Sequence, residues 1–513
     1  MSDSLPGFAD TVVIGGGTAG AAIAGELAAR SDQSLLLLEA GPDYGAFDDG
    51  RWPADLTDAR AIPTSHDWGY TSGGQYGQRT IKFDRARVIG GCSSHNGCAA
   101  IWGSRLDYDH WAELGNPGWS AGDLLGFFRA GSERLRVRIP PRDEITPYQL
   151  AWLKAAPRAG IPLVADLNNL DESLGMAPSP ANVADGIRWN AAFAYLDPVR
   201  RCHHLTIADG VLADRLLIRG ARVEAVRVAR NGREATIRTG RVVLAAGTYG
   251  SPAILIRSGI GPEAEVRALG VIPVLDLPGV GRNLHDHPLV GLVYAGTPEL
   301  EAAMAEFATR HWMPEEQTIA KARSSRCNRG FDLHIYPVGG RAERTAWSWA
   351  LAVACLTPHS RGVLKLTSRD PAAAPQLDHA YLSDPDGEDG RVLVDGIHIA
   401  RELAAAPALA ASLGKEKWPG AGVLSADQVA EFTRTTVAHY FHPVGTCAMG
   451  PAGDRGAVVD ARGRVHGLDN CYIGDASIMP VVPRANTNIP ALVVGLRIAD
   501  SLLAASSKAP AQG

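Results

Sequence analysis

The sequence TVVIGGGTAG at residues 11–20 decides the fold. Its apolar, β-branched start predicts a buried strand, glycines follow, and the alanine-rich sequence after them predicts a helix over residues 19–29. A second apolar run, LLLL at residues 35–38, ends at Glu39. Strand, glycine turn, helix and strand in this order predict a βαβ unit, and therefore a parallel sheet with helices on its faces.

The glycine turn has the spacing Gly-x-Gly-x-x-Gly at Gly15, Gly17 and Gly20. Because these positions lack Cβ atoms, backbone N–H groups and the positive end of the helix dipole can approach a pyrophosphate. Glu39 follows Gly20 by 19 residues, at the end of the next predicted strand, where a carboxylate can accept hydrogen bonds from ribose hydroxyls. Together these features predict a dinucleotide-binding site, although the glycines alone would also fit a tight turn without a ligand.

A second polar strand end follows the apolar residues 471–473. The sequence there reads GDAS, and a carboxylate at Asp475 could order the middle of a long cofactor, which favours FAD over NAD. The alternative is a solvated strand end in which Ser477 caps a helix.

Composition excludes several classes of protein. The chain has 513 residues, enough for two to four domains or one large α/β domain. With 50 Lys and Arg against 55 Asp and Glu, it lacks the basic balance expected of a nucleic-acid-binding surface. Its seven cysteines include no Cys-x-x-Cys pair, so we expect reduced, mostly structural thiols rather than disulfides or zinc.

The sequence also gives expectations about membranes and targeting. Apolar stretches such as residues 347–356 are shorter than the roughly 18 residues that span a bilayer, so we expect no membrane span. Residues 1–10 have no basic region of the kind that opens a signal peptide, so we expect a cytoplasmic protein.

Further strands are expected along the chain. Residues 205–211 and 222–228 predict a strand pair, Asn-Gly at 231–232 a turn into residues 235–239, and the apolar run 242–247 a buried parallel strand that rejoins the first sheet. After a break at residues 296–298, strands of a separate sheet are expected at residues 331–336, 348–356 and 362–367. A capping box at residues 425–428 opens a helix that is expected to run towards His439.

Ordered motifs along nearly the whole chain resemble the glucose-methanol-choline (GMC) oxidoreductases. They read RVIGGCSSHNG at 87–97, AGTYGSP at 246–252, SGIGP at 258–262, LPGVGRNL at 277–284, DHP at 286–288, FHPVGT at 441–446, DASIMP at 475–480 and NTN at 486–488. The resemblance implies an α/β fold: a Rossmann-like FAD-binding domain with an inserted substrate-binding domain built on an antiparallel sheet. We place the FAD domain at residues 1–150, 200–295 and 438–505, the substrate domain at 151–199 and 296–437, and a flexible tail at 506–513.

The resemblance also implies the reaction. It implies FAD-dependent oxidation of a primary alcohol to the aldehyde by hydride transfer to flavin N5, with O2 as acceptor giving H2O2. The alternatives are a choline or alcohol dehydrogenase with another acceptor, or a hydroxynitrile lyase-type enzyme without net redox chemistry on the same fold. The partners expected are a small alcohol and an electron acceptor, and the chain is expected to be a monomer or a homodimer.

Within the family the sequence is most similar to choline oxidases, in which the histidine of the GGCSSHN stretch is joined to the flavin. His95 is the matching position, so an 8α-histidyl FAD is implied. The alternative is that His95 packs beside a noncovalent FAD.

Two residues are the candidates for catalysis. His442 has an ordinary pKa near neutrality, and Pro443 disfavours a helical backbone there, which suits a general base presented at a cleft after a helix. Taken alone, such a histidine is more often a helix-end or core residue. By resemblance, Asn486 stands opposite it, where a neutral amide can donate to the developing alkoxide; its alternative is a turn residue. His439 is expected to be structural, and His466 has no assigned role.

The remaining candidates concern the cofactor and metals. Residues 285–287 could in principle ligate a metal, but in the family this segment is a structural loop, and we expect no metal site. The residues expected to bind FAD are Gly15, Gly17, Thr18, Ala19, Gly20, Glu39, Ala40, Arg87, Gly91, Ser94, His95, Asn96, Gly97, Val211, Asp475, Ala476, Asn486 and Thr487.

The sequence departs from choline oxidases in the substrate region. The stretch KARSSRCNR at residues 321–329, which we match to their ammonium-binding glutamate region, has four cations and no carboxylate. A serine of those enzymes is Gly97 here, and their additional active-site histidine is matched by Thr357, with His359 two positions away. These differences predict a neutral or anionic alcohol rather than choline.

Overall fold

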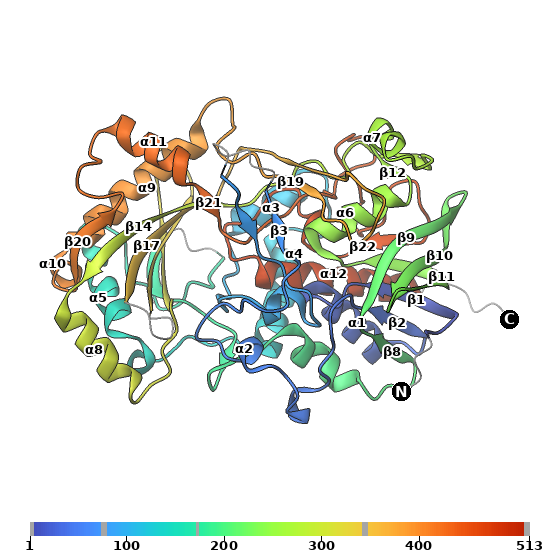
Figure 1. Ribbon diagram of the computed structural model, residues 1–513, viewed down its shortest axis with the longest axis horizontal. Coiled ribbons are helices and arrows are strands. Elements are labelled where there is room, and N and C mark those ends of the chain that lie inside the picture. The colour runs from blue at the N-terminus through green and yellow to red at the C-terminus, as the bar shows by residue number, and fades with distance from the viewer. Residues whose placement is uncertain (1–4, 73–78, 171–173, 341–346, 507–513) are drawn as a thin grey trace.

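The computed structural model describes residues 5–72, 79–170, 174–340 and 347–506. Two large sheets divide the chain, one on each side of the view in Figure 1. The segment expected to form a flexible tail lies, apart from its first residue, outside the described residues.

The first sheet has seven strands in the order β8-β2-β1-β11-β10-β9, with β22 also paired to β11. The strands β8, β2, β1, β11 and β22 pair in parallel, whereas β9, β10 and the first half of β11 form an antiparallel meander. The bounds are β1 (Phe8–Ile14), β2 (Leu35–Leu38), β8 (Leu205–Ala208), β9 (Val211–Arg219), β10 (Arg222–Arg230), β11 (Arg233–Leu244) and β22 (Cys471–Ile473).

The predicted βαβ unit is present, and two details of this sheet differ from expectation. The expected strand 235–239 and the first part of the expected strand 242–247 are one continuous strand, β11, because the chain leaves the meander and enters the parallel ladder without a break. The strand ends at Leu244, and α6 begins at Gly247. The partner of β10 is β9; residues 205–208 instead form the parallel edge strand β8.

Helices cover the first sheet. Helix α1 (Thr18–Arg30) packs against α12 (Asn488–Ser506), which also packs against α4 (Ala121–Arg134). Helix α12 is long and apolar enough to cross a membrane by length and composition alone. The apolar runs considered in the sequence did not include this segment. In the fold, 56% of its apolar window is buried, which is what a core helix between two neighbours requires.

The second sheet is antiparallel, in the order β20-β14-β17-β16-β15-β5, with β21 paired to β14. Helix α9 packs on it, and α5 and α11 pack on α9. The bounds are β5 (Gly175–Pro178), β14 (Pro288–Gly296), β15 (Thr318–Ala322), β16 (Leu333–Gly340), β17 (Ser348–Cys355), β20 (Leu413–Trp418), β21 (Ala438–His439), α5 (Pro147–Ala155), α8 (Pro298–Ala308), α9 (Glu388–Ala404), α10 (Pro407–Ala410) and α11 (Ala426–Thr436).

The sheets do not divide the chain at the expected residues. Strand β14 belongs to the second sheet although it lies before residue 296, and α5 packs with that sheet's helices although it begins before residue 151. Within the described part of the chain, residues 363–365 do not join the large sheet; β18 (Val363–Lys365) pairs with β19 (Gln376–Asp378) in a two-stranded sheet.

Short elements complete the fold. The expected capping box at Ser425 does open α11, but the helix ends at Thr436, before His439. All seven cysteines are free thiols. The remaining elements are α2 (Ala54–Thr57), α3 (Arg105–Glu113), α6 (Gly247–Arg257), α7 (Glu263–Ala268), β3 (Tyr70–Thr71), β4 (Lys82–Phe83), β6 (Val183–Ala184), β7 (Ile187–Arg188), β12 (Ile260–Gly261) and β13 (Leu275–Asp276).

Candidate active site

The glycine turn between β1 and α1 is shaped by close backbone contacts. A Cβ at Gly20 would lie 1.9 Å from the carbonyl oxygen of Gly15, and Gly15 itself has φ +102°, in the left-handed region. Gly17 caps α1 without any side-chain hydrogen bond, so the first N–H groups of the helix remain open to a ligand. The turn therefore has the geometry that a bound pyrophosphate needs.

Glu39 closes the next strand beside this turn. Its two carboxylate oxygens accept hydrogen bonds from the backbone N–H groups of Gly16 and Gly41, each at 2.8 Å. Burial raises its pKa to about 7, against the lowering effect of those hydrogen bonds. The carboxylate is thus fixed at the edge of the cavity, where a ribose hydroxyl could donate to it.

A single large cavity begins at this turn and extends to the second sheet. Its lining includes Tyr336 of β16 and Tyr440, which follows β21, so both sheets contribute walls. Most residues expected to bind FAD line it: Gly15, Gly17, Thr18, Ala19, Glu39, Ala40, Gly91, His95, Asn96, Gly97, Val211, Asp475, Ala476, Asn486 and Thr487. At Gly247, which also lines it, an added Cβ would meet nothing within 4 Å. The cavity and its open N–H groups fit an FAD.

Three residues expected at the cofactor do not line this cavity. Gly20 lies behind the turn, and the Ser94 hydroxyl donates to the carbonyl of Ile89 at 3.1 Å. The Arg87 guanidinium lies 4.8 Å above the ring of Trp68, which does line the cavity. In this structure these three residues support the walls of the cavity.

Asp475 lies at the cofactor cavity, two residues after the end of β22. Its carboxylate accepts from the backbone N–H groups of Gly247, at 2.9 Å, and of Ser477, at 2.8 Å. It therefore caps the short 3-10 helix Ala476–Ile478 and ties it to the start of α6. The residue that caps this short helix is therefore Asp475, whereas Ser477, the cap considered from the sequence, lies within the helix.

His95 follows the short 3-10 helix Gly91–Ser94 and is buried at the cavity wall. Its Nε2 lies 2.7 Å from the carbonyl oxygen of Ser65. Because a carbonyl can only accept, Nε2 carries the proton and Nδ1 keeps its lone pair. Burial lowers the pKa of His95, so the ring is neutral.

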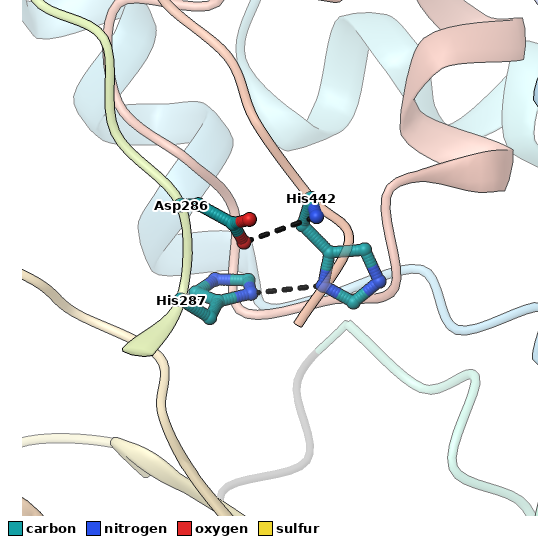
Figure 2. A group of neighbouring side chains, drawn as sticks. All are labelled: Asp286, His287 and His442. Atoms are coloured by element: carbon teal, nitrogen blue, oxygen red, sulfur yellow. Dashed lines mark hydrogen bonds between the residues drawn. The ribbon is translucent and has the colours of Figure 1, made fainter. Parts of the chain in front are cut away.

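His442 lies in the loop that follows β21, a strand of the second sheet. Its backbone N–H donates to Asp286 Oδ1 at 3.0 Å, and its Nδ1 lies 3.0 Å from Nδ1 of His287 (Figure 2). The sequence predicted that His442 directly follows a helix, but α11 ends six residues earlier, and β21 with Phe441 at φ +65° makes the approach instead.

Burial determines the charge states of His442 and Asp286. It lowers the pKa of His442 well below its ordinary value, and the neighbouring His287, Arg85, His334 and His439 lower it further. The imidazole is therefore neutral and able to accept a proton. Burial also raises the pKa of Asp286 to about 7.

Asn486 lies on the same cavity, as the resemblance implied, and only 8% of it is exposed. Its Oδ1 has no hydrogen-bond partner among the described residues. Its amide interacts with the hydroxyl of Tyr440 and so lowers the pKa of that phenol, against the larger raising effect of burial. An unsatisfied buried carbonyl oxygen in a cavity wall is costly unless a ligand donates a hydrogen bond to it.

The other histidines take structural places. His439 pairs with Pro288 between β21 and β14, and His466 Nε2 lies 3.0 Å from the carbonyl of Gly450. His285 Nδ1 contacts the carbonyl of Asn283 at 2.6 Å, and its Nε2 accepts from the N–H of Val482.

The segment 285–287 therefore does not act as one ligand set. Asp286 and His287 do lie with His442, all three offering atoms within 4.8 Å of one another. Each is engaged in the hydrogen bonds just described, which accounts for the cluster.

The substrate region differs from the sequence expectation. None of the four cations in residues 321–329 lines the cavity: Lys321 Nζ donates to the carbonyl of Leu167, Arg323 to that of Gly330, and Arg326 pairs with Glu388. A carboxylate does line it, from Glu316, five residues before that stretch. The expectation of a cationic site was wrong because these side chains lie outside the cavity, where carbonyl groups and Glu388 engage three of them.

Glu316 faces the cavity beside two aromatic rings. Tyr336 and Tyr440 stack with centroids 5.4 Å apart, and the ionised Glu316 raises the pKa of both phenols, after the larger effect of burial. Burial, and then the charge of Glu315, raise the pKa of Glu316 to about 7. Glu316 was not among the residues predicted from the sequence; the adjacent Glu-Glu pair before β15 was the available signal.

Similarity to known proteins shows which family the chain belongs to. Residues 9–289 match the N-terminal part of the GMC oxidoreductase family and residues 358–495 its C-terminal part. The chain is 32% identical to an oxygen-dependent choline dehydrogenase of Brucella anthropi, over 96% of this chain and 95% of that protein. It is also 32% identical to a choline oxidase of Arthrobacter globiformis, over 97% and 94%.

A solved structure gives the same answer for the fold. The crystal structure of a pyridoxine 4-oxidase from Mesorbium loti superposes with a TM-score of 0.86 at 29% identity, covering 96% of this chain and 98% of that one. The expected family and fold class are confirmed. The chain belongs to the GMC oxidoreductases and is an FAD-dependent oxidoreductase that acts on alcohols.

Proposed function

We propose that the protein oxidises a primary alcohol that carries a basic or cationic nitrogen to the corresponding aldehyde. The observation that carries this proposal is the position of Glu316 on the same cavity as His442 and Asn486. One cavity thus combines a neutral imidazole, an amide and a carboxylate with the glycine turn that fits FAD.

When FAD is bound, it supplies the hydride acceptor for the alcohol carbon. The residues of this chain accept the hydroxyl proton and stabilise the oxygen that loses it. His442 Nε2, on the ring edge away from His287 (Figure 2), accepts the hydroxyl proton as general base. The Asn486 amide donates to the alkoxide oxygen that develops, without competing for the proton. The low pKa of His442 keeps it unprotonated and ready at neutral pH.

The nitrogen of the substrate is placed by Glu316 and the stacked pair Tyr336 and Tyr440. An ionised carboxylate attracts a cation, and phenol faces add cation–π attraction when the cation is desolvated. Choline is a quaternary ammonium alcohol and pyridoxine a pyridine bearing hydroxymethyl groups. The relatives named for these substrates therefore support a nitrogen-bearing alcohol.

We further propose O2 as the electron acceptor and a covalent bond between His95 and FAD. The relatives named as oxidases and as an oxygen-dependent dehydrogenase support oxygen. The lone pair left at His95 Nδ1, on a neutral ring in the cavity wall, supports attachment.

Anaerobic stopped-flow spectroscopy of the purified holoenzyme tests the function. Choline, pyridoxine, benzyl alcohol and glycolate should be mixed separately with the oxidised enzyme. We expect bleaching of the flavin by a nitrogen-bearing alcohol and little by glycolate. If none of the alcohols reduces the flavin, the oxidation proposal is wrong, and a lyase without net redox chemistry gains support. If benzyl alcohol or glycolate is the better reductant, the assignment of the nitrogen site to Glu316 is wrong.

A further inference from the structure

The imidazoles of His287 and His442 meet through the same kind of nitrogen. Nδ1 of each ring lies 3.0 Å from Nδ1 of the other, and the side chains are 0% and 7% exposed. Two neutral rings can form this hydrogen bond only if one Nδ1 carries the proton and the other offers a lone pair. The contact therefore couples the tautomers of the two residues.

The two possible pairs have opposite consequences for catalysis. If His287 donates, His442 carries its only proton on Nε2 and cannot accept a proton from an alcohol there. If His442 donates, its Nε2 has the free lone pair that a general base needs. A fixed partner on the remote ring nitrogen is how proteins set which imidazole nitrogen is available.

We propose that His287 is a positioning residue that accepts the Nδ1–H of His442 and so keeps His442 Nε2 unprotonated. This proposal rests on the role given to His442 in the proposed function. His287 itself touches neither cofactor nor substrate, since it does not line the cavity.

In the part of the chain that the structure describes, the surroundings of His287 leave its Nδ1 to His442 alone. The backbone carbonyls of Leu356 and Pro483 act on its ring as acceptors and raise its pKa, although the larger effect of burial lowers that pKa to about 3. Its Nδ1 is engaged by His442, and Nε2 makes no hydrogen bond of ordinary geometry among the described residues. The contact of the two Nδ1 atoms allows either pair, and the role of His442 Nε2 as general base selects the one in which His287 Nδ1 accepts.

The backbone fixes the pair as well. Asp286 holds the backbone N–H of His442, and its other oxygen accepts from the hydroxyl of Tyr381 at 3.2 Å. Pro288 restricts the backbone of His287 to extended angles and begins β14. Both rings are therefore anchored on each side of their contact. The other titratable groups that act on His442 are Arg85, His334 and His439.

Two variants of the holoenzyme separate hydrogen bonding from packing. In His287→Asn, the amide oxygen lies near the position of Nδ1 and can still accept; in His287→Leu, no acceptor remains. Nitrogen NMR of the ring-labelled holoenzyme reports the tautomer of His442, and its signals are assigned by their loss in His442→Asn. We expect the proton on Nδ1 in the wild type and in His287→Asn, and a shift towards Nε2–H in His287→Leu.

The rate of flavin reduction by choline gives the second measurement. We expect His287→Leu to lower the limiting rate by about 10²-fold, at the lower end of the range for general-base catalysis, with an unchanged apparent Kd for choline. His287→Asn should recover most of that rate. A wild-type His442 protonated on Nε2, or equal rates in His287→Leu and the wild type, would overturn the proposal. If choline fails to reduce the wild-type flavin, the substrate proposal fails, and the NMR measurement still decides the tautomer.

Discussion

Replacing Glu316 by glutamine removes one charge from the cavity and changes little else in size. Two unit charges about 5 Å apart attract by about 3 kcal/mol at an effective dielectric constant of about 20. Because the Glu316 side chain is partly exposed, screening by water reduces this to about 1.5–2 kcal/mol. We therefore expect KM for a cationic alcohol to rise by roughly ten- to thirty-fold in Glu316→Gln at pH 8.

The pH dependence makes this prediction specific. With a pKa of about 7, Glu316 is mostly ionised at pH 8 and mostly protonated at pH 6. The wild-type KM for choline should rise as the pH falls through 7, whereas the variant should show no such change. The two curves should converge near pH 5, where only about a hundredth of Glu316 is ionised.

Steady-state oxidation of choline, followed by peroxide or by an artificial acceptor, measures these curves. Glu315→Gln is the matched control, because Glu315 does not line the cavity. The charge of Glu315 raises the pKa of Glu316. Glu315→Gln should therefore move the rise in KM for choline to lower pH without abolishing it. An unchanged KM in Glu316→Gln at pH 8, or an equal rise for benzyl alcohol, would refute the reasoning.

Three further changes test the cofactor and the base. His442→Ala should retain FAD, but the flavin should be reduced about 10²- to 10⁴-fold more slowly in stopped flow. An undiminished rate would show that His442 is not the base. In the wild type, acid precipitation should leave the flavin in the protein pellet, whereas His95→Ala should release it; release from the wild type would disprove the bond. Gly20→Val places side-chain atoms against the carbonyl of Gly15, so it should yield colourless protein, and a normal flavin spectrum would contradict that packing.

Local sequence was sufficient for the cofactor half of the fold. Strand, turn and helix at residues 8–30 follow from apolar patterning and from Gly15 and Gly20, where an added Cβ would collide with a backbone carbonyl, and these signals are contained in one short segment. The strands of the first sheet were misjudged at β11, because its polar, alternating first part and its apolar end read as two separate strands although the chain passes from one set of partners to the other without a break.

The catalytic group shows the limit of such reasoning. His442 and Asn486 were found through a resemblance, but the partner His287 was not, because the contact joins residues 155 positions apart. Glu316 was missed for a related reason. Its position in the cavity depends on how β15 pairs with β16 and β5, and no pattern within residues 312–329 fixes that pairing.

The attachment of the two imidazoles has a mechanical consequence. His287 immediately precedes β14, and His442 follows β21, which is hydrogen-bonded to β14. Both rings are thus carried by adjacent strands of one sheet, while the glycine turn belongs to the other. A small hinge displacement between the halves would change the reach from base to flavin yet leave the paired rings in register. Turnover could then be tuned by substitutions remote from either ring.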